Sequence, residues 1–395
     1  MKPTNLKTSR MQRIYLNSDD CRIEDLAALT SETVQLEDYP FASDVQKNVL
    51  IYDCNTICSQ IADAESRMAI MAEWVDALHK GPGVVVLKHA QTDDAILDRA
   101  SAMFWAMIDE QHRTGSGGGD HFAKPGANDR VWNSLGKHCL KDPKNFVAYY
   151  GNPILALISE AWLGPYYQVT AQLNVVNPGG AAQSAHRDYH LGFLIAADVA
   201  RNPLHVHQFS PMLTLQGAIA HVDATLETGP TLLLPFSQKY DAGYFAMNRP
   251  DFKEFFNAYH VQLPLEKGDM LFFSPALFHA AGTNRSRDVK RMVNLFQISS
   301  AFGRSMETVD RTAMCKVLFS VLANAAGTFS ASQIECAIGA CAEGYSFPTN
   351  LDRDPPLGGL APKTQRMLFK EALAAGWSSD RFNRALDEQT ARKLA

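Results

Sequence analysis

The chain has 395 residues, 46% of them hydrophobic, and its 37 basic and 42 acidic side chains give a formal charge of −5. This length and hydrophobic content support one large core or two modest ones. A mildly acidic chain without a block of Lys and Arg is a poor nucleic-acid binder, because phosphate contacts need clustered basic residues. Its longest wholly apolar runs, such as residues 83–87, are too short to span a bilayer. We therefore expect neither nucleic-acid nor membrane partners.

The N-terminal part of the sequence predicts an irregular segment followed by regular structure. Residues 1–60 have no sustained hydrophobic period and no signal-peptide stretch, so we expect an N-terminal arm in a cytoplasmic protein. Seven scattered cysteines without zinc-knuckle spacing fit reduced thiols in that compartment. Residues 67–80 predict an amphipathic helix that Gly81-Pro82 ends, residues 83–87 predict a strand, and a second helix begins at Thr92.

The rest of the chain predicts strands and then helices. Many short strands at near-regular spacing are typical of a barrel or a jelly roll. The fold class is therefore α+β with a mainly β core: an N-terminal arm at 1–60, a β domain at 61–303, and a helical C-terminal extension at 304–395 packed on that domain. The expected strands are 166–176, 212–221, 231–234, 260–265, 269–274 and 292–298, and the expected later helices are 305–323, 330–342, 363–376 and 379–394.

Residues 184–190 carry the first candidate for chemistry, the pair His186 and Asp188. Residues two apart on a strand point the same way, so an imidazole nitrogen and a carboxylate oxygen can face one ion. A second histidine from another strand would complete a facial triad, which leaves positions open for a bidentate co-substrate and dioxygen. Nitrogen and oxygen ligands without thiolate favour Fe(II).

The segment from Gly268 to Arg291 supplies the missing members of such a site. It predicts a strand leading to His279, a tight Gly282–Asn284 turn, and a strand that begins at Arg291 and returns beside the strand of His279. An arginine in that place can grip a distal carboxylate with two parallel hydrogen bonds while the other end of the diacid chelates the iron.

Two other histidine pairs compete with this assignment. His221 and Asp223 form a second H-x-D, but they end an apolar strand, and a structural role is the stronger interpretation. His205 and His207 have a spacing that can bind metal, yet no carboxylate accompanies them, and we expect a polar loop there.

With these motifs in hand, the sequence resembles the phytanoyl-CoA dioxygenase family of Fe(II)/2-oxoglutarate-dependent oxygenases over roughly residues 65–300. The matching pieces are the strand 83–87 after a helix, His186-Arg187-Asp188, Glu227-Thr228-Gly229-Pro230-Thr231 with Pro235-Phe236-Ser237, Gly268-Asp269, and His279 through Asn284-Arg285-Ser286 to Arg291.

The resemblance implies a double-stranded β-helix (jelly roll, cupin-like) and a set of site residues. It implies that His186, Asp188 and His279 are the catalytic iron ligands and that Arg291 binds the far carboxylate of 2-oxoglutarate. Asn174 resembles a position that contacts the near carboxylate. Many members carry a serine two residues after the distal histidine, where this sequence has Ala281. The hydroxyl beside the arginine would then come from Thr283 or Thr231.

The predicted function is that of a dioxygenase that uses Fe(II), 2-oxoglutarate and dioxygen to oxidise a C–H bond of a small molecule, with release of succinate and CO2. A cupin-like metal-dependent hydrolase or isomerase is the alternative from another enzyme class, and a non-catalytic 2-oxoglutarate-binding protein is a third. The sequence leaves open the substrate, the choice between hydroxylation, desaturation and cyclisation, and the role of 304–395. That extension could be a lid, a homodimer surface or simple packing.

Overall fold

The computed structural model describes residues 10–115, 126–325 and 327–394. The chain divides into two compact units. Unit 1 consists of Met1–His89, Gly118–Arg130 and Asn174–Val293, and unit 2 consists of Ala90–Gly117, Val131–Leu173 and Asn294–Ala395. Strands β4 (Asn128–Val131), β5 (Gln168–Val176) and β10 (Arg291–Ser299) each contain residues of both units. The predicted boundaries at residues 60 and 303 stay predictions.

One eight-stranded mixed sheet has the order β1-β2-β3-β8-β6-β10-β5-β4. Within unit 1, β2 runs parallel to β3, and the other pairs from β1 to β6 are antiparallel. Leu271 of β8 lies opposite Val86 of β3 on one side and opposite Ala218 of β6 on the other. These strands are β1 (Asp44–Gln46), β2 (Val49–Asp53), β3 (Val84–Lys88), β6 (Thr214–Ala220) and β8 (Met270–Phe273).

A second, smaller layer of strands in unit 1 contains His279. Strand β9 (Phe278–Ala280) pairs with β7 (Leu232–Leu234), and isolated bridges extend the layer to His186 on one side and to Val261 on the other. Apolar side chains from both layers form one buried cluster that includes Val84, Val86, Leu271 and Phe273 from the large sheet, Leu233 from the small one, and Leu263 and Leu265 from the segment that follows Val261.

The N-terminal segment of unit 1 is more regular than predicted. Residues 49–53 are an apolar run, and burial against β3 makes them a sheet strand although they have no alternating pattern. Helix α2 (Ile23–Thr30) contributes Leu26 to a second apolar cluster. Further helices of unit 1 in the described residues are α3 (Cys54–Gln60), α4 (Ala64–His79), α9 (Ala196–Val199), α10 (Leu204–Phe209), α11 (Gly243–Ala246) and α12 (Pro250–Tyr259).

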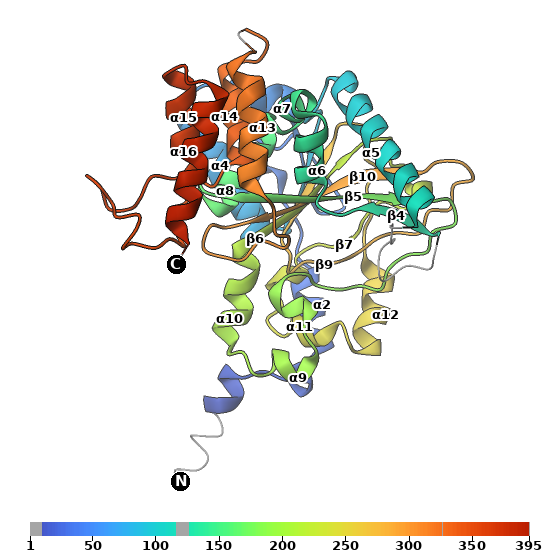
Figure 1. Ribbon diagram of the computed structural model, residues 1–395. Helices are drawn as coiled ribbons and strands as arrows, with labels where there is room; N and C mark the ends of the chain where they lie inside the picture. Colours follow the sequence, from blue (N-terminus) through green and yellow to red (C-terminus); the bar gives the residue numbers. More distant parts are fainter. Residues whose placement is uncertain (1–9, 116–125, 326, 395) are drawn as a thin grey trace. The chain divides into compact units, whose positions relative to one another are not determined.

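Unit 2 is largely helical, and its C-terminal helices lie beside one another and beside α7 and α8 (Figure 1). Phe319, Phe369 and Phe382 join three of them through ring contacts with centroids 4.1 to 5.4 Å apart. The four helices predicted after residue 304 are present. The helices of unit 2 are α5 (Asp94–Thr114), α6 (Ser134–Lys141), α7 (Pro143–Tyr150), α8 (Pro153–Leu163), α13 (Arg311–Ala323), α14 (Ala331–Cys341), α15 (Gln365–Ala374) and α16 (Ser379–Lys393).

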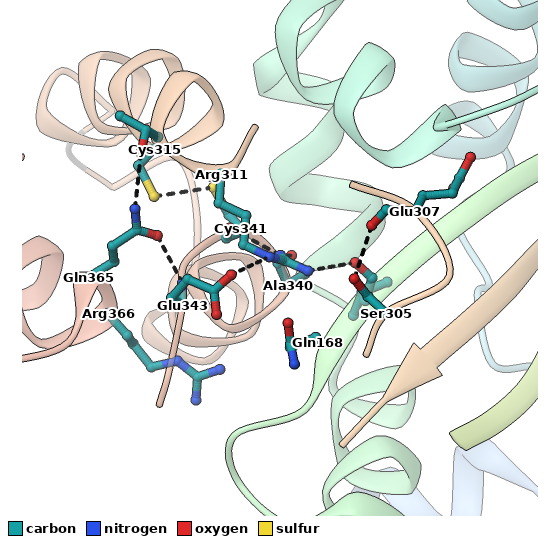
Figure 2. Close-up of polar contacts among 12 residues, drawn as sticks. Gln168, Ser305, Glu307, Arg311, Cys315, Ala340, Cys341, Glu343, Gln365 and Arg366 are labelled. Carbon is teal, nitrogen blue, oxygen red and sulfur yellow. Dashed lines mark hydrogen bonds and ion pairs between the residues drawn. The ribbon is translucent and has the colours of Figure 1, made fainter. Parts of the chain in front are cut away.

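Arg311, the first residue of α13, is the centre of a polar network in unit 2 (Figure 2). Its guanidinium donates to the carbonyls of Ala340 and Cys341 at 3.0 and 3.2 Å and to that of Val169 at 2.9 Å, and it pairs with Glu343 at 3.1 Å. The last carbonyls of a helix lack partners within the helix, and a cation there also opposes the negative end of the helix dipole. Arg311 therefore caps α14 and ties it to β5.

Two predicted strand arrangements are wrong. Residues 260–265 form bridges only at Val261 and Leu265, because Pro264 has no N–H to donate to a ladder. Strand β10 does not return beside β9; it lies between β6 and β5 in the large sheet. Both edges of β9 are already occupied, by β7 and by His186, so no edge remains for β10.

Candidate functional site

Two short chain segments meet to form the site in unit 1. His186 and His279 exchange backbone hydrogen bonds, from the N–H of His186 to the carbonyl of His279 at 3.0 Å and from the N–H of His279 to the carbonyl of His186 at 3.2 Å. Directly opposed residues of an antiparallel pair project to the same side. The two imidazole rings accordingly lie 4.5 Å apart between centroids.

Backbone carbonyls fix the orientation of both rings. The Nδ1 atom of His186 lies 2.8 Å from the carbonyl of Ser184, and Nδ1 of His279 lies 2.8 Å from that of Leu277. A carbonyl only accepts, so each Nδ1 carries a hydrogen, and Nε2 is the nitrogen of each ring that remains available to bind an ion. Ligand atoms of His186, Asp188 and His279 all lie within 4.8 Å of one another, and no other such group occurs in the described part of the chain.

Asp188 completes the cluster and is held from a third strand. Its Oδ2 lies 3.4 Å from Nε2 of His279, and its Oδ1 lies 3.8 Å from Nε2 of His186. The Nε2 of Gln216, on β6, donates to Oδ2 at 2.5 Å. Burial by itself raises the pKa of Asp188, but the hydrogen bond with His279, the charges of both histidines and the Gln216 amide outweigh it, so the pKa is well below its usual range. The carboxylate is therefore an anion at neutral pH.

Arg291 is a buried cation at the start of β10. It is 4% exposed, and its Nη1 donates to the carbonyl of Thr228 at 3.2 Å. Burial lowers the pKa of Arg291 to about 10, and no charged partner among the described residues offsets that effect. Burial of a charge without an anion is costly, so this guanidinium is well suited to an anionic ligand.

The other predicted co-substrate residues lie in different settings. Asn174 is buried, and its Oδ1 accepts from Nη2 of Arg130 at 3.5 Å. The hydroxyl of Thr283 accepts from the N–H of Ala182 at 2.9 Å. Thr231 directly precedes β7, in which Leu233 lies opposite His279, and by strand alternation we expect the Thr231 side chain on the face that bears His279.

The competing histidines have local partners. The carboxylate of Asp223 accepts from the N–H of Lys267 at 2.9 Å, and His221 is 2% exposed at the end of β6. His207 lies on α10, where its Nε2 is 3.1 Å from the carbonyl of Asn202. Neither His221 nor His207 belongs to a cluster of metal-ligating groups in the residues that the structure describes.

A family model described as phytanoyl-CoA dioxygenase (PhyH) matches residues 66–292, which is more than half of the chain. The chain belongs to the phytanoyl-CoA dioxygenase family. The resemblance stated from the sequence is confirmed, and every residue from His186 to Arg291 lies inside the matched range.

Parts of the sequence are similar to curated dioxygenases from fungi. It is 31% identical over 125 residues to Dioxygenase trt7 of Aspergillus terreus, which is 32% of this chain and 38% of the relative. It is 30% identical over 141 residues to the Iron/alpha-ketoglutarate-dependent dioxygenase ausU of Aspergillus calidoustus, which is 35% and 41%. The chain thus spans about two fifths of the length of the curated relatives it matches.

Solved structures to which the chain is similar include the non-heme alpha ketoglutarate dependent epimerase SnoN and carbocyclase SnoK from nogalamycin biosynthesis. SnoN is 19% identical, with 59% of this chain and 82% of SnoN covered at a TM-score of 0.41. SnoK is 18% identical, with 57% and 83% covered at 0.40.

Sequence patterns did not point to Gln216 or Arg187. Gln216 lies 28 residues after Asp188 on a separate strand, and only the fold brings its amide to the carboxylate. Arg187 stands inside the H-x-D motif, in a segment with one isolated bridge at His186, and its guanidinium donates to the carbonyls of Ser237 and Tyr240. In the sequence, the alternation of side chains along an extended segment was the one signal that Arg187 points away from His186 and Asp188.

Proposed function

We propose that this chain is an Fe(II)- and 2-oxoglutarate-dependent dioxygenase that oxidises a C–H bond of a small molecule and releases succinate and CO2. The observation that carries the proposal is the convergence of two imidazoles and one carboxylate, with both Nε2 atoms oriented by their Nδ1 contacts. This donor set fits Fe(II), and three ligands on one side of an ion leave positions open for other molecules. When bound, the iron would activate dioxygen with the 2-oxo acid as the source of two electrons.

Arg291 supports 2-oxoglutarate as the co-substrate. A dicarboxylate of that length chelates a metal through one end and presents a carboxylate at the other. Arg291 offers a buried, positively charged fork with no anion beside it in the described residues. The hydroxyl of Thr231 is our choice for the second contact to that carboxylate, since we expect it on the face that bears His279. Asn174 and Thr283 remain proposed contacts to the co-substrate.

The chain's own residues prepare the site in three ways. The Ser184 and Leu277 carbonyls keep the histidine rings in one tautomer, so the ligand nitrogens need no rearrangement before an ion binds. Gln216 occupies Oδ2 of Asp188 and leaves Oδ1 to the ion. The anionic carboxylate of Asp188 attracts a divalent cation to the site.

We also propose that the two sheet layers of unit 1 are the double-stranded β-helix of the family. The small layer that contains β7 and β9 faces the large sheet across one apolar core, as two sheets of a jelly roll do. His186 and His279 lie on adjacent segments of the small layer, and Gln216 reaches Asp188 from the large one.

Two measurements test the proposal. Purified protein loaded anaerobically should bind one Fe(II) per chain, and His279→Ala should abolish stoichiometric binding whereas the matched variant His221→Ala should retain it. Iron lost in His221→Ala and kept in His186→Ala would overturn the triad. A screen over small-molecule classes for succinate release should then yield a substrate-dependent signal, and metal-dependent turnover without succinate would favour a hydrolase or isomerase.

We further propose where the protein is located and how its chains associate. A cytoplasmic location fits the free thiols, of which five are buried. In the described residues no helix is long and apolar enough to cross a membrane. A homodimer through residues 304–395 is supported by exposed Leu357, Leu360 and Leu394, and light scattering on the purified chain measures it.

A further inference from the structure

The side chain of Arg187 lies on the face of its segment opposite to the ligands His186 and Asp188. It is 5% exposed. Its Nη2 donates to the carbonyls of Ser237 and Tyr240 at 2.6 and 2.9 Å. The guanidinium carbon lies 4.7 Å from the ring centroid of Phe278 and 5.2 Å from that of Tyr244.

Burial of the Arg187 guanidinium costs free energy that an apolar side chain would not cost. A buried cation loses its hydration, and burial lowers the pKa of Arg187 to about 10. No carboxylate among the described residues forms an ion pair with it; two carbonyl dipoles and two aromatic faces hold it instead. An apolar side chain of similar volume would pack here without that penalty, so the charge has a purpose other than simple packing.

Two glycines make room for Arg187. A Cβ atom built on Gly243 would overlap the guanidinium carbon, and one on Gly192 would overlap the Arg187 carbonyl oxygen. Neither glycine has the left-handed backbone that only glycine adopts easily, so space is the reason for both. Gly243 therefore leaves space for the Arg187 guanidinium, and Gly192 leaves space for the backbone of the same residue.

The contacts of Arg187 form a closed ring that joins both ligand-bearing segments. Arg187 bonds the Ser237 carbonyl, the Ser237 hydroxyl accepts from the N–H of Phe278 at 2.8 Å, and the Phe278 ring lies against Arg187. Phe278 directly precedes His279. The ring thus connects residue 187 to residue 278 on the back of the same pair of segments whose front carries the histidines.

We propose that Arg187 is a positioning residue: its guanidinium fixes the 186–188 segment against β9, so that His186, Asp188 and His279 face a single ion. The proposal rests on the proposed metal site. Arg187 acts through the backbone of its neighbours and touches no ligand atom. Its loss should loosen the alignment of the three ligands while the two apolar clusters keep the unit folded.

The test compares Fe(II) binding, measured anaerobically with Fe(II) alone, in wild type and in Arg187→Met. Methionine keeps an unbranched side chain between the two rings but loses the charge and both hydrogen bonds. Loss of a group that orients metal ligands weakens binding by roughly 10- to 100-fold. We expect a loss of that size in Arg187→Met, with Arg187→Lys between the two because ammonium cannot reproduce the planar fork.

Arg249→Met is the matched control. Arg249 also donates to two carbonyls, those of Ser18 and Cys21, and lies 5.1 Å from the Phe252 ring centroid; it further pairs with Asp251 at 2.6 Å, and it contacts neither ligand segment. Its variant should bind Fe(II) like wild type even where its melting temperature falls. Equal weakening in both variants would mean general destabilisation and would overturn the positioning role.

Gly243→Ala approaches the same contact from the other side, since it displaces an intact Arg187. It should weaken Fe(II) binding in the same direction, and it decides the matter if Arg187→Met does not fold. Wild-type affinity in a folded Arg187→Met or Gly243→Ala would refute the proposal while leaving the metal site standing. Failure of wild type itself to bind Fe(II) would instead refute the proposed function.

Discussion

Replacement of Arg291 by methionine should change stability and co-substrate binding in opposite directions. Methionine approximates the arginine stem, so the packing at the start of β10 is largely kept. The variant removes a buried cation that has no anionic partner in the described residues, which by itself stabilises the fold. It also removes the donor to the Thr228 carbonyl, which costs about 1 kcal/mol. The net change in unfolding free energy should therefore be small or favourable.

The effect on 2-oxoglutarate should be large. A carboxylate that loses a buried, hydrogen-bonded cationic partner loses about 2–5 kcal/mol. That range corresponds to a dissociation constant raised roughly 30-fold to a few thousand-fold. Fe(II) binding should persist, because Arg291 is not among the three converging ligand groups.

Titration calorimetry of 2-oxoglutarate into Fe(II)-loaded protein under nitrogen measures the binding change, and thermal melts of the same samples measure stability. Lys290→Ala, at the exposed neighbouring position, is the control and should leave both quantities unchanged. The reasoning is refuted if Arg291→Met binds 2-oxoglutarate as wild type does. It is also refuted if the variant loses several kcal/mol of stability, because Arg291 would then be a structural cation.

Further predictions concern single side chains. Asp188→Asn should remain folded in thermal melts but lose 2-oxoglutarate consumption, because an amide replaces the anionic ligand; near-wild-type consumption would exclude Asp188 as the iron carboxylate. Gln216→Leu should weaken Fe(II) binding by roughly 10- to 100-fold in anaerobic titrations, since Asp188 loses its donor; an unchanged affinity would make that hydrogen bond incidental. Burial lowers the pKa of His138 to about 4. Between pH 6.5 and 4 the unfolded chain therefore binds a proton that the folded chain does not, and the free energy of unfolding decreases as the pH is lowered. Measured by urea unfolding, the decrease in the free energy of unfolding from pH 7 to pH 5 should be about 2 kcal/mol smaller in His138→Phe than in wild type. Equal decreases in the two proteins would contradict this account. Cys58 is the exposed thiol, and Cys58→Ser should remove the fastest phase of labelling by a thiol reagent; its persistence would point to partly exposed Cys336.

The sequence was informative where one physical rule determines the outcome. The 2-residue period of strands predicted that His186 and Asp188 point the same way, and in the structure their ligand atoms lie within one cluster with His279. Helix periodicity and turn residues predicted α4, the start of α5 and three of the four helices after residue 304 to within three residues, whereas α13 begins six residues later than predicted.

Pairing between distant segments was not accessible to such rules. The partner of β9 depends on which edges are free, and nothing near residue 280 indicates that β7 and His186 already occupy both. Strand β2 has no alternation because both of its faces are covered, so its sequence reads as an apolar run without period. The contact between Gln216 and Asp188 likewise depends on tertiary structure alone.

The interleaving of the two units has a consequence for how the chain folds during synthesis. The last stretch of unit 2 begins at Asn294, and it supplies Arg311 and the cluster of Phe319, Phe369 and Phe382. Residues 131–173 leave the ribosome more than 120 residues before these partners exist. The apolar helices in these residues can form their contacts with the C-terminal helices only late, because those contacts join residues far apart in the sequence. Until then their exposed hydrophobic surface favours aggregation. Slow translation or chaperone capture at that stage should therefore decide the yield of folded protein more than the stability of the finished fold.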